Sequence, residues 1–383
     1  MHLLLKFSLV AILFFTSCEL TDENQGTVEQ QEEEEQPEEA PDFFRGADLS
    51  YVNELEECGA AYFNEAGESK DPYQIFSEAN TDLVRLRLWH NPNWTNYSNF
   101  EDVKKSISRA RALNMQVLLD FHYSDDWVDP GKQIVPAAWL PVVNNMPVLG
   151  DSIYNYTFEV LKKLNDLDLV PEFVQVGNET NIEILQDPNG TYNGINWNRN
   201  AFLINKGLKA VRDASAAFGK DIQIFLHVAQ PENALWWFEA AQQNGVTNYD
   251  WIGISYYPLW SDIPLEDLPA AVQTLTDTYN KRLMVVETAY PFTLDNKDNA
   301  NNILGQDAAV AGFAISPQGQ YDYLKALEQK ISEGGGEGLI YWEPAWVSTT
   351  CSTQWAQGSH WDNATLFDHN NWANVGMRYY RGE

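Results

Sequence analysis

The segment "VQVGNETN", residues 174–181, runs from a short apolar stretch directly into a glycine, an asparagine and a glutamate. A short apolar run that ends at a glycine is typical of a strand buried in a parallel sheet. Such a strand would carry the carboxylate of Glu179 at its C-terminal tip. This position at a strand tip raises the question of whether a second carboxylate works with it.

Seven further segments are also short and apolar, and amphipathic, helix-like segments separate them. The eight candidate strands are residues 43–49, 83–88, 116–121, 172–177, 222–228, 251–255, 282–287 and 338–342. The helix-like segments are residues 73–80, 100–114, 153–168, 199–219, 233–245, 265–281 and 320–335. This alternation predicts the α/β class and a (β/α)8 TIM barrel, with residues 43–383 as a single catalytic domain.

The alternative fold is an open, doubly wound sheet. That fold usually has a glycine-rich turn after its first strand, where phosphate groups bind. The corresponding segment here is "DLSYVNEL", residues 48–55, which contains no glycine. The barrel is therefore favoured.

The first 42 residues differ in composition from the rest of the chain. Residues 1–17 combine Lys6 with an apolar run and small residues before Cys18, the pattern of a signal peptide cleaved ahead of a lipidated cysteine. Residues 19–42 hold 11 acidic residues and no Lys or Arg, so residues 18–42 are interpreted as a lipid-anchored acidic linker. We expect an exported protein, lipid-anchored through Cys18 to the bacterial membrane at the cell surface. The alternative is an ordinary secretory signal.

The net charge and the aromatic content restrict the possible partners. The chain carries a net charge of −31 and contains 14 Trp. A surface this acidic repels nucleic acid, so we expect no nucleic-acid partner and a neutral substrate. Tryptophan and tyrosine rings stack on flat ligands such as sugars, although core packing also uses them. We expect a monomer whose composition favours a carbohydrate substrate.

Polar and aromatic side chains follow the C-terminal ends of the predicted strands, where barrel enzymes place their active sites. They are Asp48, Arg85, Arg87, His122, Asn178, Glu179, His227, Tyr256, Tyr257, Glu287, Trp342 and Glu343. Glu179 and Glu287 follow the fourth and end the seventh strand, which lie nearly opposite each other in a barrel. Two carboxylates that face one cleft are the machinery of glycoside hydrolysis. Tyr256 and an arginine of the second strand are expected beside Glu287 and would keep it ionised.

Seven longer motifs carry a family resemblance. They are RGADLSYV (45–52), LVRLRLWHNP (83–92), LLDFHYSDDWVDPGKQ (118–133), VGNET (176–180), GISYYPLW (253–260), VVETAYP (285–291) and YWEPAW (341–346). With these motifs the chain from about Phe43 onward resembles the endo-β-1,4-galactanases of glycoside hydrolase family 53. The resemblance implies a retaining endo-hydrolase of β-1,4-galactan, the neutral side chain of pectin, with Glu179 as acid/base and Glu287 as nucleophile. The expected substrate-binding residues are Asp48, Arg85, His122, Trp127, Asn178, His227, Tyr256, Trp342 and Trp346.

The loop after the seventh strand, "TLDNKDNANNILGQD" (293–307), crowds oxygen-bearing side chains together. It resembles the calcium loop of bacterial galactanases, which implies a structural Ca²⁺ shared with the loop after the eighth strand. The implied ligands are Asp295, Asn296, Asp298, the carbonyl of Ala300, Asn302, Ser359 and Asp362. Asn296 stands where the family has an aspartate, and the alternative is an asparagine-rich turn without an ion. We expect no organic cofactor, and the histidines lack the spacing of a zinc site.

Two questions stay open at the level of sequence. Cys58 and Cys351 follow the first and eighth strands, which are neighbours in a closed barrel, so they either form a disulfide or remain two independent thiols. The alternative functions are a glycan-binding surface lipoprotein on an inactive scaffold and a related retaining hydrolase of β-mannan or β-glucan. Inactive binders usually lack one catalytic carboxylate, whereas both Glu179 and Glu287 are present here.

Overall fold

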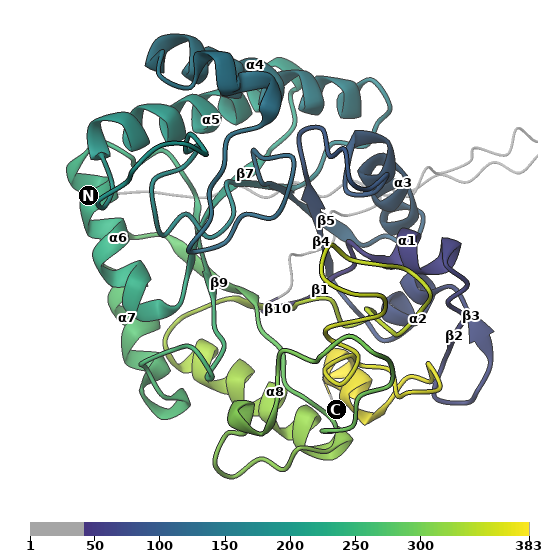
Figure 1. Cartoon of the computed structure of the whole chain (residues 1–383). Coiled ribbons are helices and arrows are strands. Elements are labelled where there is room, and N and C mark those ends of the chain that lie inside the picture. The colour runs from purple at the N-terminus through teal and green to yellow at the C-terminus, as the bar shows by residue number, and fades with distance from the viewer. Residues whose placement is uncertain (1–41, 383) are drawn as a thin grey trace, which may run out of the picture. The chain divides into compact units, whose positions relative to one another are not determined.

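The structure is a computed structural model that describes residues 42–382. Eight parallel strands form a closed barrel in the order β1-β10-β9-β8-β7-β6-β5-β4, and helices surround it (Figure 1). The barrel strands are β1 (Phe44–Asp48), β4 (Leu83–Leu88), β5 (Gln116–Phe121), β6 (Phe173–Val176), β7 (Gln223–Ala229), β8 (Trp251–Ser255), β9 (Arg282–Glu287) and β10 (Gly338–Tyr341). All eight predicted strands are present with nearly the predicted ends, which confirms the TIM barrel.

Eight α-helices lie on the outside of the barrel, in the part of the chain that the structure describes. They are α1 (Val52–Glu57), α2 (Pro72–Glu78), α3 (Phe100–Arg111), α4 (Met146–Asn165), α5 (Trp197–Phe218), α6 (Pro231–Gln243), α7 (Leu268–Tyr279) and α8 (Pro317–Glu333). Short 3-10 helices are η1 (Ala137–Val142), η2 (Leu265–Asp267), η3 (Gln306–Ala308) and η4 (Val375–Arg381). The last of them packs against α8, so the end of the chain closes over the final helix.

The sequence did not predict helix α1 or the strands β2 and β3, and it placed the start of helix α4 too late. Helix α1 has six residues, and the hairpin of β2 (Tyr62–Phe63) and β3 (Ser69–Lys70) has two residues per strand. Neither is long enough to show a period. Helix α4 begins earlier than predicted, at Met146, because the side chain of Asn145 accepts a hydrogen bond from the backbone N–H of Val148 and caps it.

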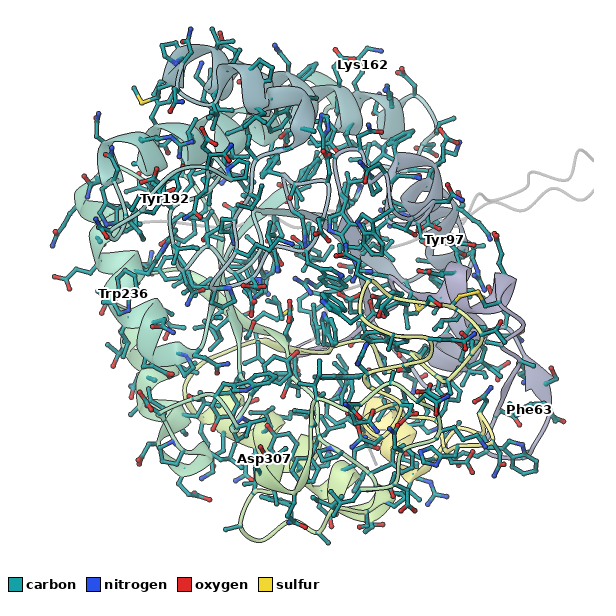
Figure 2. All side chains as sticks on the ribbon, in the orientation of Figure 1. Phe63, Tyr97, Lys162, Tyr192, Trp236 and Asp307 are labelled. Carbon is teal, nitrogen blue, oxygen red and sulfur yellow. A yellow bond between two sulfur atoms is a disulfide. The ribbon has the colours of Figure 1, made fainter. Side chains whose placement is uncertain are left out.

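The interior of the barrel changes character along its axis. Its lower layer is apolar and consists of Phe44, Leu83, Leu118, Phe173, Phe225, Trp251, Met284 and Ile340, and Val286, higher on β9, packs with the same cluster. Inward-facing residues recur at every second position, and two positions above Leu83, Leu118, Phe173 and Phe225 the layer holds Arg85, Asp120, Gln175 and His227. We call the first set the apolar layer. The polar layer is the second set together with Asp48 and Glu287, which end β1 and β9 and pair with Arg85. Side chains fill the space inside the ring of helices (Figure 2).

A disulfide joins Cys58, at the end of α1, to Cys351 in the loop after β10. The Cα atoms of the two cysteines are 5.6 Å apart, within the usual range for a disulfide. The structure thereby settles the pairing that the sequence left open. Within residues 42–382, no helix combines the length and the apolar character that crossing a membrane requires.

Candidate active site

A cleft of about 450 Å³ opens at the C-terminal ends of the barrel strands. Its lining residues are Asp48, Arg85, Arg87, His122, Trp127, Val128, Asp129, Lys132, Asn178, Glu179, Glu287, Ile303, Trp342, Trp346, Trp355 and His360. The cleft contains both predicted catalytic glutamates and seven of the nine predicted substrate-binding residues. The two exceptions are His227 and Tyr256.

Glu179 stands in a tight turn beyond the tip of β6. Gly177 and Glu179 have φ angles of 86° and 43°, and this left-handed region costs a residue with a side chain about 1–2 kcal/mol. Hydrogen bonds hold the turn: Gln133 Nε2 donates to the carbonyls of Asn178 at 2.8 Å and Glu179 at 3.1 Å. The backbone N–H of Thr180 donates to the carbonyl of His227 at 2.9 Å. The turn directs Glu179 into the cleft.

The two glutamates face each other across the cleft. A carboxylate oxygen of Glu179, one of Glu287 and a ring nitrogen of His227 lie within 4.8 Å of one another. The two carboxylates have different partners. Glu179 Oε1 accepts a hydrogen bond from Ser255 Oγ at 2.6 Å, whereas Glu287 forms an ion pair with Arg85 at 2.9 Å. One carboxylate is therefore paired with a neutral donor and the other with a cation.

Arg85 is the cation that organises the polar layer. It is 1% exposed and pairs with Asp48 at 2.9 Å, with Asp120 at 2.8 Å and with Glu287 at 2.9 Å. Its Nη2 also donates to Asn178 Oδ1 at 2.8 Å. A single guanidinium with five donors in a fixed fork can hold several carboxylates in defined positions. Because Arg85 contacts both Glu287 and Asn178, it fixes the nucleophile candidate relative to the turn that carries Glu179.

These surroundings separate the acidities of the two glutamates. Burial and the nearby charge of Glu287 raise the pKa of Glu179 well above its ordinary value. Burial also raises the pKa of Glu287, to about 7, while the Arg85 cation acts in the opposite direction. Glu287 therefore ionises first, and Glu179 holds its proton. This is the division between an acid and a nucleophile that glycoside hydrolysis requires.

Aromatic rings form the wall of the cleft on the side of β5 and β10. The Trp342 ring lies 6.2 Å from that of Trp127 and 6.0 Å from that of Trp346, measured between centroids. Trp346 in turn stacks on Tyr51 at 4.2 Å. The Arg87 guanidinium lies 4.1 Å from the Trp127 ring centroid, so it stabilises the position of this ring by a cation–π contact. Flat apolar faces set among hydrogen-bonding groups suit a sugar ring.

Two predicted substrate-binding residues do not reach the cleft. The Tyr256 side chain is fully buried and its O–H donates to the carbonyl of Ile263 at 3.1 Å. The neighbouring Tyr257 donates to Glu287 Oε2 at 3.3 Å instead. Since Ser255 points inward to Glu179, alternation of side chains turns Tyr256 outward and Tyr257 back in. The prediction of Tyr256 beside Glu287 was therefore wrong by one residue.

His227 is the second correction. The side chain is 0% exposed and lies behind Glu179. Its Nε2 is 2.9 Å from Ser255 Oγ and its Nδ1 is 3.1 Å from Gln175 Nε2. It occupies the polar layer below the strand tip, so its position serves to orient Glu179 and not to contact a substrate.

Sequence patterns assigned no substrate-binding role to several residues in or beside the cleft. Arg87 was recognised at the end of a predicted strand. Its ion pair with Glu343 at 3.2 Å joins residues far apart in the sequence, so sequence spacing could not predict it. Ser255, which is buried behind Glu179 and does not line the cleft, lies in the quoted motif "GISYYPLW". Alternation along β8 from the inward-facing Trp251 would have predicted that Ser255 also points inward. Ile303, Trp355 and His360 come from long loops that have no period, so no sequence signal placed them in the cleft.

The loops after β9 and β10 meet at a cluster of acidic and amide side chains. Asp298 accepts hydrogen bonds from the backbone N–H groups of Ala300 and Ser359, each at 2.8 Å. Asp362 accepts from Asn302 Nδ2 at 2.8 Å, and Ser348 Oγ donates to both carboxylates. Asn302 Oδ1 is buried and has no hydrogen-bond partner within the described residues.

Two of the predicted calcium ligands stand apart from this cluster. Asp295 is exposed, and within residues 42–382 its backbone N–H alone has a hydrogen-bond partner, the side chain of Thr293. Ser359 Oγ donates to the carbonyl of Trp346 at 2.6 Å, so only its backbone contacts Asp298. The remaining predicted ligands gather: Asn296 Nδ2 donates to the carbonyl of Ala300 at 2.8 Å. Loop conformation, which composition does not reveal, decides which of the oxygens converge.

A closed barrel whose cleft holds two unequal carboxylates between aromatic walls defines a barrel glycoside hydrolase. Comparison with known proteins identifies the family. The pattern of glycosyl hydrolase family 53 matches residues 44–379. The chain belongs to this family, which confirms the resemblance that the sequence motifs indicated, and it is a glycosidase.

Individual relatives agree with this assignment. The chain is 54% identical to an arabinogalactan endo-beta-1,4-galactanase of Cellvibrio japonicus over 85% of this chain and 86% of the relative. It is 32% identical to an endo-beta-1,4-galactanase of Bacillus subtilis over 86% of this chain and 83% of the relative. Among solved structures, the family 53 catalytic domain of Ignisphaera aggregans matches with a TM-score of 0.81 and 32% identity, covering 90% of this chain and 97% of that one.

Proposed function

We propose that the chain is an endo-acting hydrolase of β-1,4-galactan that retains the configuration of the cleaved anomeric carbon. The relatives named above supply the substrate class. The single observation that carries the mechanism is the approach of the two glutamates, whose nearest carboxylate oxygens lie within 4.8 Å. Retaining hydrolases separate their two carboxyl groups by about 5–5.5 Å, whereas inverting ones leave about 6.5–9.5 Å for a water molecule. The short separation favours retention.

The roles follow from the partners of each carboxylate. Ionised Glu287, held by Arg85 at 2.9 Å, attacks the anomeric carbon while protonated Glu179 donates its proton to the departing glycosidic oxygen. The bond from Glu287 to the sugar forms as the glycosidic bond breaks. Water then attacks the covalent intermediate with ionised Glu179 as the base, and Glu287 is released. Tyr257, which donates to Glu287 Oε2, would hold that oxygen in place during both steps.

Purified domain incubated with galactan, β-mannan and β-glucan tests the substrate. We expect fragments from galactan alone, with a range of chain lengths early in the reaction because the attack is internal. Proton NMR of the first products should show the β-anomer before mutarotation. Cleavage of mannan or glucan in preference to galactan would overturn the substrate. An α-anomer appearing first would overturn retention. The glycan-binding alternative has no support, because both carboxylates are present and poised.

The calcium expectation becomes a second proposal. We propose that a structural Ca²⁺ is held by Asp298, Asn302 and Asp362, with Asn296 and the Ala300 carbonyl nearby. The support is the meeting of two carboxylates and the buried, unpartnered oxygen Asn302 Oδ1, which suits a cation that prefers oxygen ligands. When bound, the ion would neutralise this acidic cluster and link the loops after β9 and β10.

Thermal melting with and without a chelator tests the calcium site. Chelation should lower the melting temperature and added Ca²⁺ should restore it, while the Asp362→Asn variant should respond much less to either. An Asp307→Asn variant, altered at an exposed site in the same loop region, serves as the matched control and should respond like the wild type. A wild-type melting curve that is the same in both conditions would contradict the proposal.

We also propose that the protein is exported and lipid-anchored through Cys18 at the bacterial cell surface. Residues 1–41, on which the signal peptide, lipidation and linker predictions fall, lie outside the described residues. The support is the sequence pattern before Cys18 and the disulfide, because disulfides persist mainly in exported proteins. Cell fractionation should release the Cys18→Ala variant but not Ser17→Ala. A Cys18→Ala variant as membrane-bound as the wild type would refute the anchor. The monomer expectation stays a prediction.

A further inference from the structure

Three buried groups form a chain of hydrogen bonds that ends on the acid/base candidate. His227 Nε2 lies 2.9 Å from Ser255 Oγ, and Ser255 Oγ lies 2.6 Å from Glu179 Oε1. The side chains of His227 and Ser255 are both 0% exposed, so water does not compete for these bonds. His227 comes from β7, Ser255 from β8 and Glu179 from the turn after β6. Three neighbouring strands therefore converge on one oxygen.

The direction of this chain is fixed at the histidine. The backbone N–H of Glu179 points at His227 Nδ1 with an N–N distance of 3.3 Å, and Gln175 Nε2 lies 3.1 Å from the same nitrogen. Asn178 Oδ1 lies 3.0 Å from it as well, but this oxygen already accepts hydrogen bonds from Arg85 Nη2 at 2.8 Å and from Gln175 Nε2 at 3.2 Å. A backbone hydrogen cannot rotate away, so a second hydrogen on Nδ1 would collide with it. Burial and the Arg85 cation hold the pKa of His227 well below its ordinary value, so the ring is neutral. Its one hydrogen is therefore on Nε2, where it donates to Ser255 Oγ.

The hydrogen on His227 Nε2 also determines the donor and acceptor roles of Ser255 and Glu179. Ser255 Oγ accepts from His227 and has a single hydrogen of its own. That hydrogen is directed to Glu179 Oε1, which must therefore act as an acceptor at this position. The other carboxyl oxygen, Oε2, has no hydrogen-bond partner within the described residues. A protonated Glu179 thus carries its hydrogen on Oε2.

We propose that Ser255, oriented by His227, is a positioning residue that keeps the transferable proton of Glu179 on Oε2 and so available to the leaving group. The inference rests on the proposed function, in which Glu179 is the acid. In the first step the proton moves from Oε2 to the glycosidic oxygen as the bond to that oxygen breaks. In the second step Oε2 takes a proton from the attacking water. Oε1 keeps its hydrogen bond to Ser255 throughout, so the carboxyl group does not have to rotate between the steps.

Removal of the Ser255 hydroxyl has a predictable effect on titration. The charged groups that act on Glu179 are Glu287 from β9, Arg85 from β4 and Asp129 from the loop after β5, while His227 from β7 is neutral. The Ser255 hydrogen bond favours the ionised form of Glu179 and opposes the effect of burial. Without it the pKa of Glu179 rises further, and the acid stays protonated to higher pH.

The test compares two substrates in the Ser255→Ala variant. Galactan needs protonation of its leaving oxygen, whereas a dinitrophenyl β-galactooligosaccharide does not, because its phenolate is a good leaving group. We expect kcat/KM for galactan to fall by about 10- to 100-fold, a part of the 10²- to 10⁴-fold that general acid catalysis contributes. The value of kcat/KM for the aryl substrate should fall by less than about threefold, since this constant reports the first step alone. The alkaline limb of the galactan profile should move to higher pH.

Matched variants make the result decisive. Ser106→Ala removes another buried serine, on α3, that bonds Asn53 and not the cleft, and it should leave both substrates unchanged. Ser255→Cys keeps the size of the side chain with a weaker donor, should give an intermediate loss, and replaces the alanine variant if that does not fold. Equal losses on both substrates, or an unmoved pH profile, would overturn the inference. A wild type inactive on galactan would instead overturn the proposed function.

Discussion

The two layers inside the barrel are built from the same strands and differ completely in chemistry. The apolar layer contains Phe44, Phe173, Phe225 and Trp251, with the Phe225 and Trp251 rings stacked at 5.0 Å. Two positions higher, the polar layer places Asp120, Gln175 and His227 around the Arg85 cation. A step of two residues is about 7 Å along a strand. Within that distance the barrel changes from a packed hydrocarbon core to a network of buried charges.

The difference shows how the molecule separates stability from activity. Each buried aromatic or aliphatic side chain in the apolar layer contributes about 1.5–3 kcal/mol relative to exposure. The polar layer instead holds Asp48, Asp120 and Glu287 around Arg85, so it buries more negative charge than positive. Desolvating a charge costs several kcal/mol even when it is paired. The lower layer therefore stabilises the fold, and the upper layer is held in a strained electrostatic state that serves the reaction.

The largest expected effect comes from Glu287→Gln in the polar layer. The activity on galactan should fall by more than about 10³-fold, which corresponds to about 4 kcal/mol of transition-state stabilisation. The melting temperature should stay the same or rise, because one of three buried carboxylates around Arg85 becomes neutral. Glu337→Gln is the matched control, since Glu337 pairs with Arg282 at the opposite end of the barrel. It should keep full activity, and a Glu287→Gln protein that unfolds would break the comparison.

The second effect tests the apolar layer through Phe225→Ala. Truncating a fully buried phenylalanine leaves a cavity and should cost about 3–5 kcal/mol of unfolding free energy. The kcat of the fraction that remains folded should change little, because Phe225 contacts rings and not the cleft. Denaturant titration measures the loss. Leu167→Ala, at a leucine that is 51% exposed, should change stability by less than about 0.5 kcal/mol. Equal losses of unfolding free energy in Phe225→Ala and Leu167→Ala would contradict the stabilising role of the apolar layer.

The third effect concerns the disulfide between Cys58 and Cys351, which joins two loops above the polar layer. The Cys58→Ser variant should lose about 2–4 kcal/mol, because the disulfide closes a long loop between residues 58 and 351. A reductant should lower the melting temperature of the wild type toward that of Cys58→Ser and leave the variant unchanged. The effect on kcat should be small, since the polar layer does not include the cysteines. A variant as stable as the wild type would show that the loop is held by other contacts.

The last effect is a pH dependence of stability, which is spread over several pH units. Burial raises the pKa of Glu287 to about 7 against the pull of Arg85, whereas a glutamate in an unfolded chain titrates near about 4.3. The folded state then binds this proton more tightly. Its contribution to stability is fully present below the unfolded pKa and is lost as the pH rises through the folded one.

Glu287→Gln cannot titrate at this position, so the melting temperature of the wild type relative to this variant should decline from about pH 4 to about pH 7. The same comparison with Glu337→Gln should show no such decline, because the Glu337 side chain is 35% exposed. Differential scanning calorimetry of the three proteins over this range gives the answer. A difference that is constant with pH would mean that Glu287 is already ionised throughout.

The sequence by itself determined the scaffold and the position of its chemistry. Eight short apolar runs separated by amphipathic segments allow few arrangements, because strand and helix periods are local properties. The tips of those runs gave Glu179 and Glu287, and the barrel topology implied that they face each other. Arg85, His122, Asn178 and the tryptophans followed from motif and strand position, and all of them line the cleft.

Only the tertiary structure decided which side chains interact with one another. One guanidinium serving three carboxylates, the placement of His227 behind Glu179, and the choice of Tyr257 over Tyr256 depend on contacts between strands far apart in sequence. The pairing of Cys58 with Cys351 joins residues 293 positions apart. Ile303 and Trp355 enter the cleft from loops without any period. Sequence patterns report which face of an element is buried, whereas partners, protons and loop positions are set by distances that exist only once the barrel has closed.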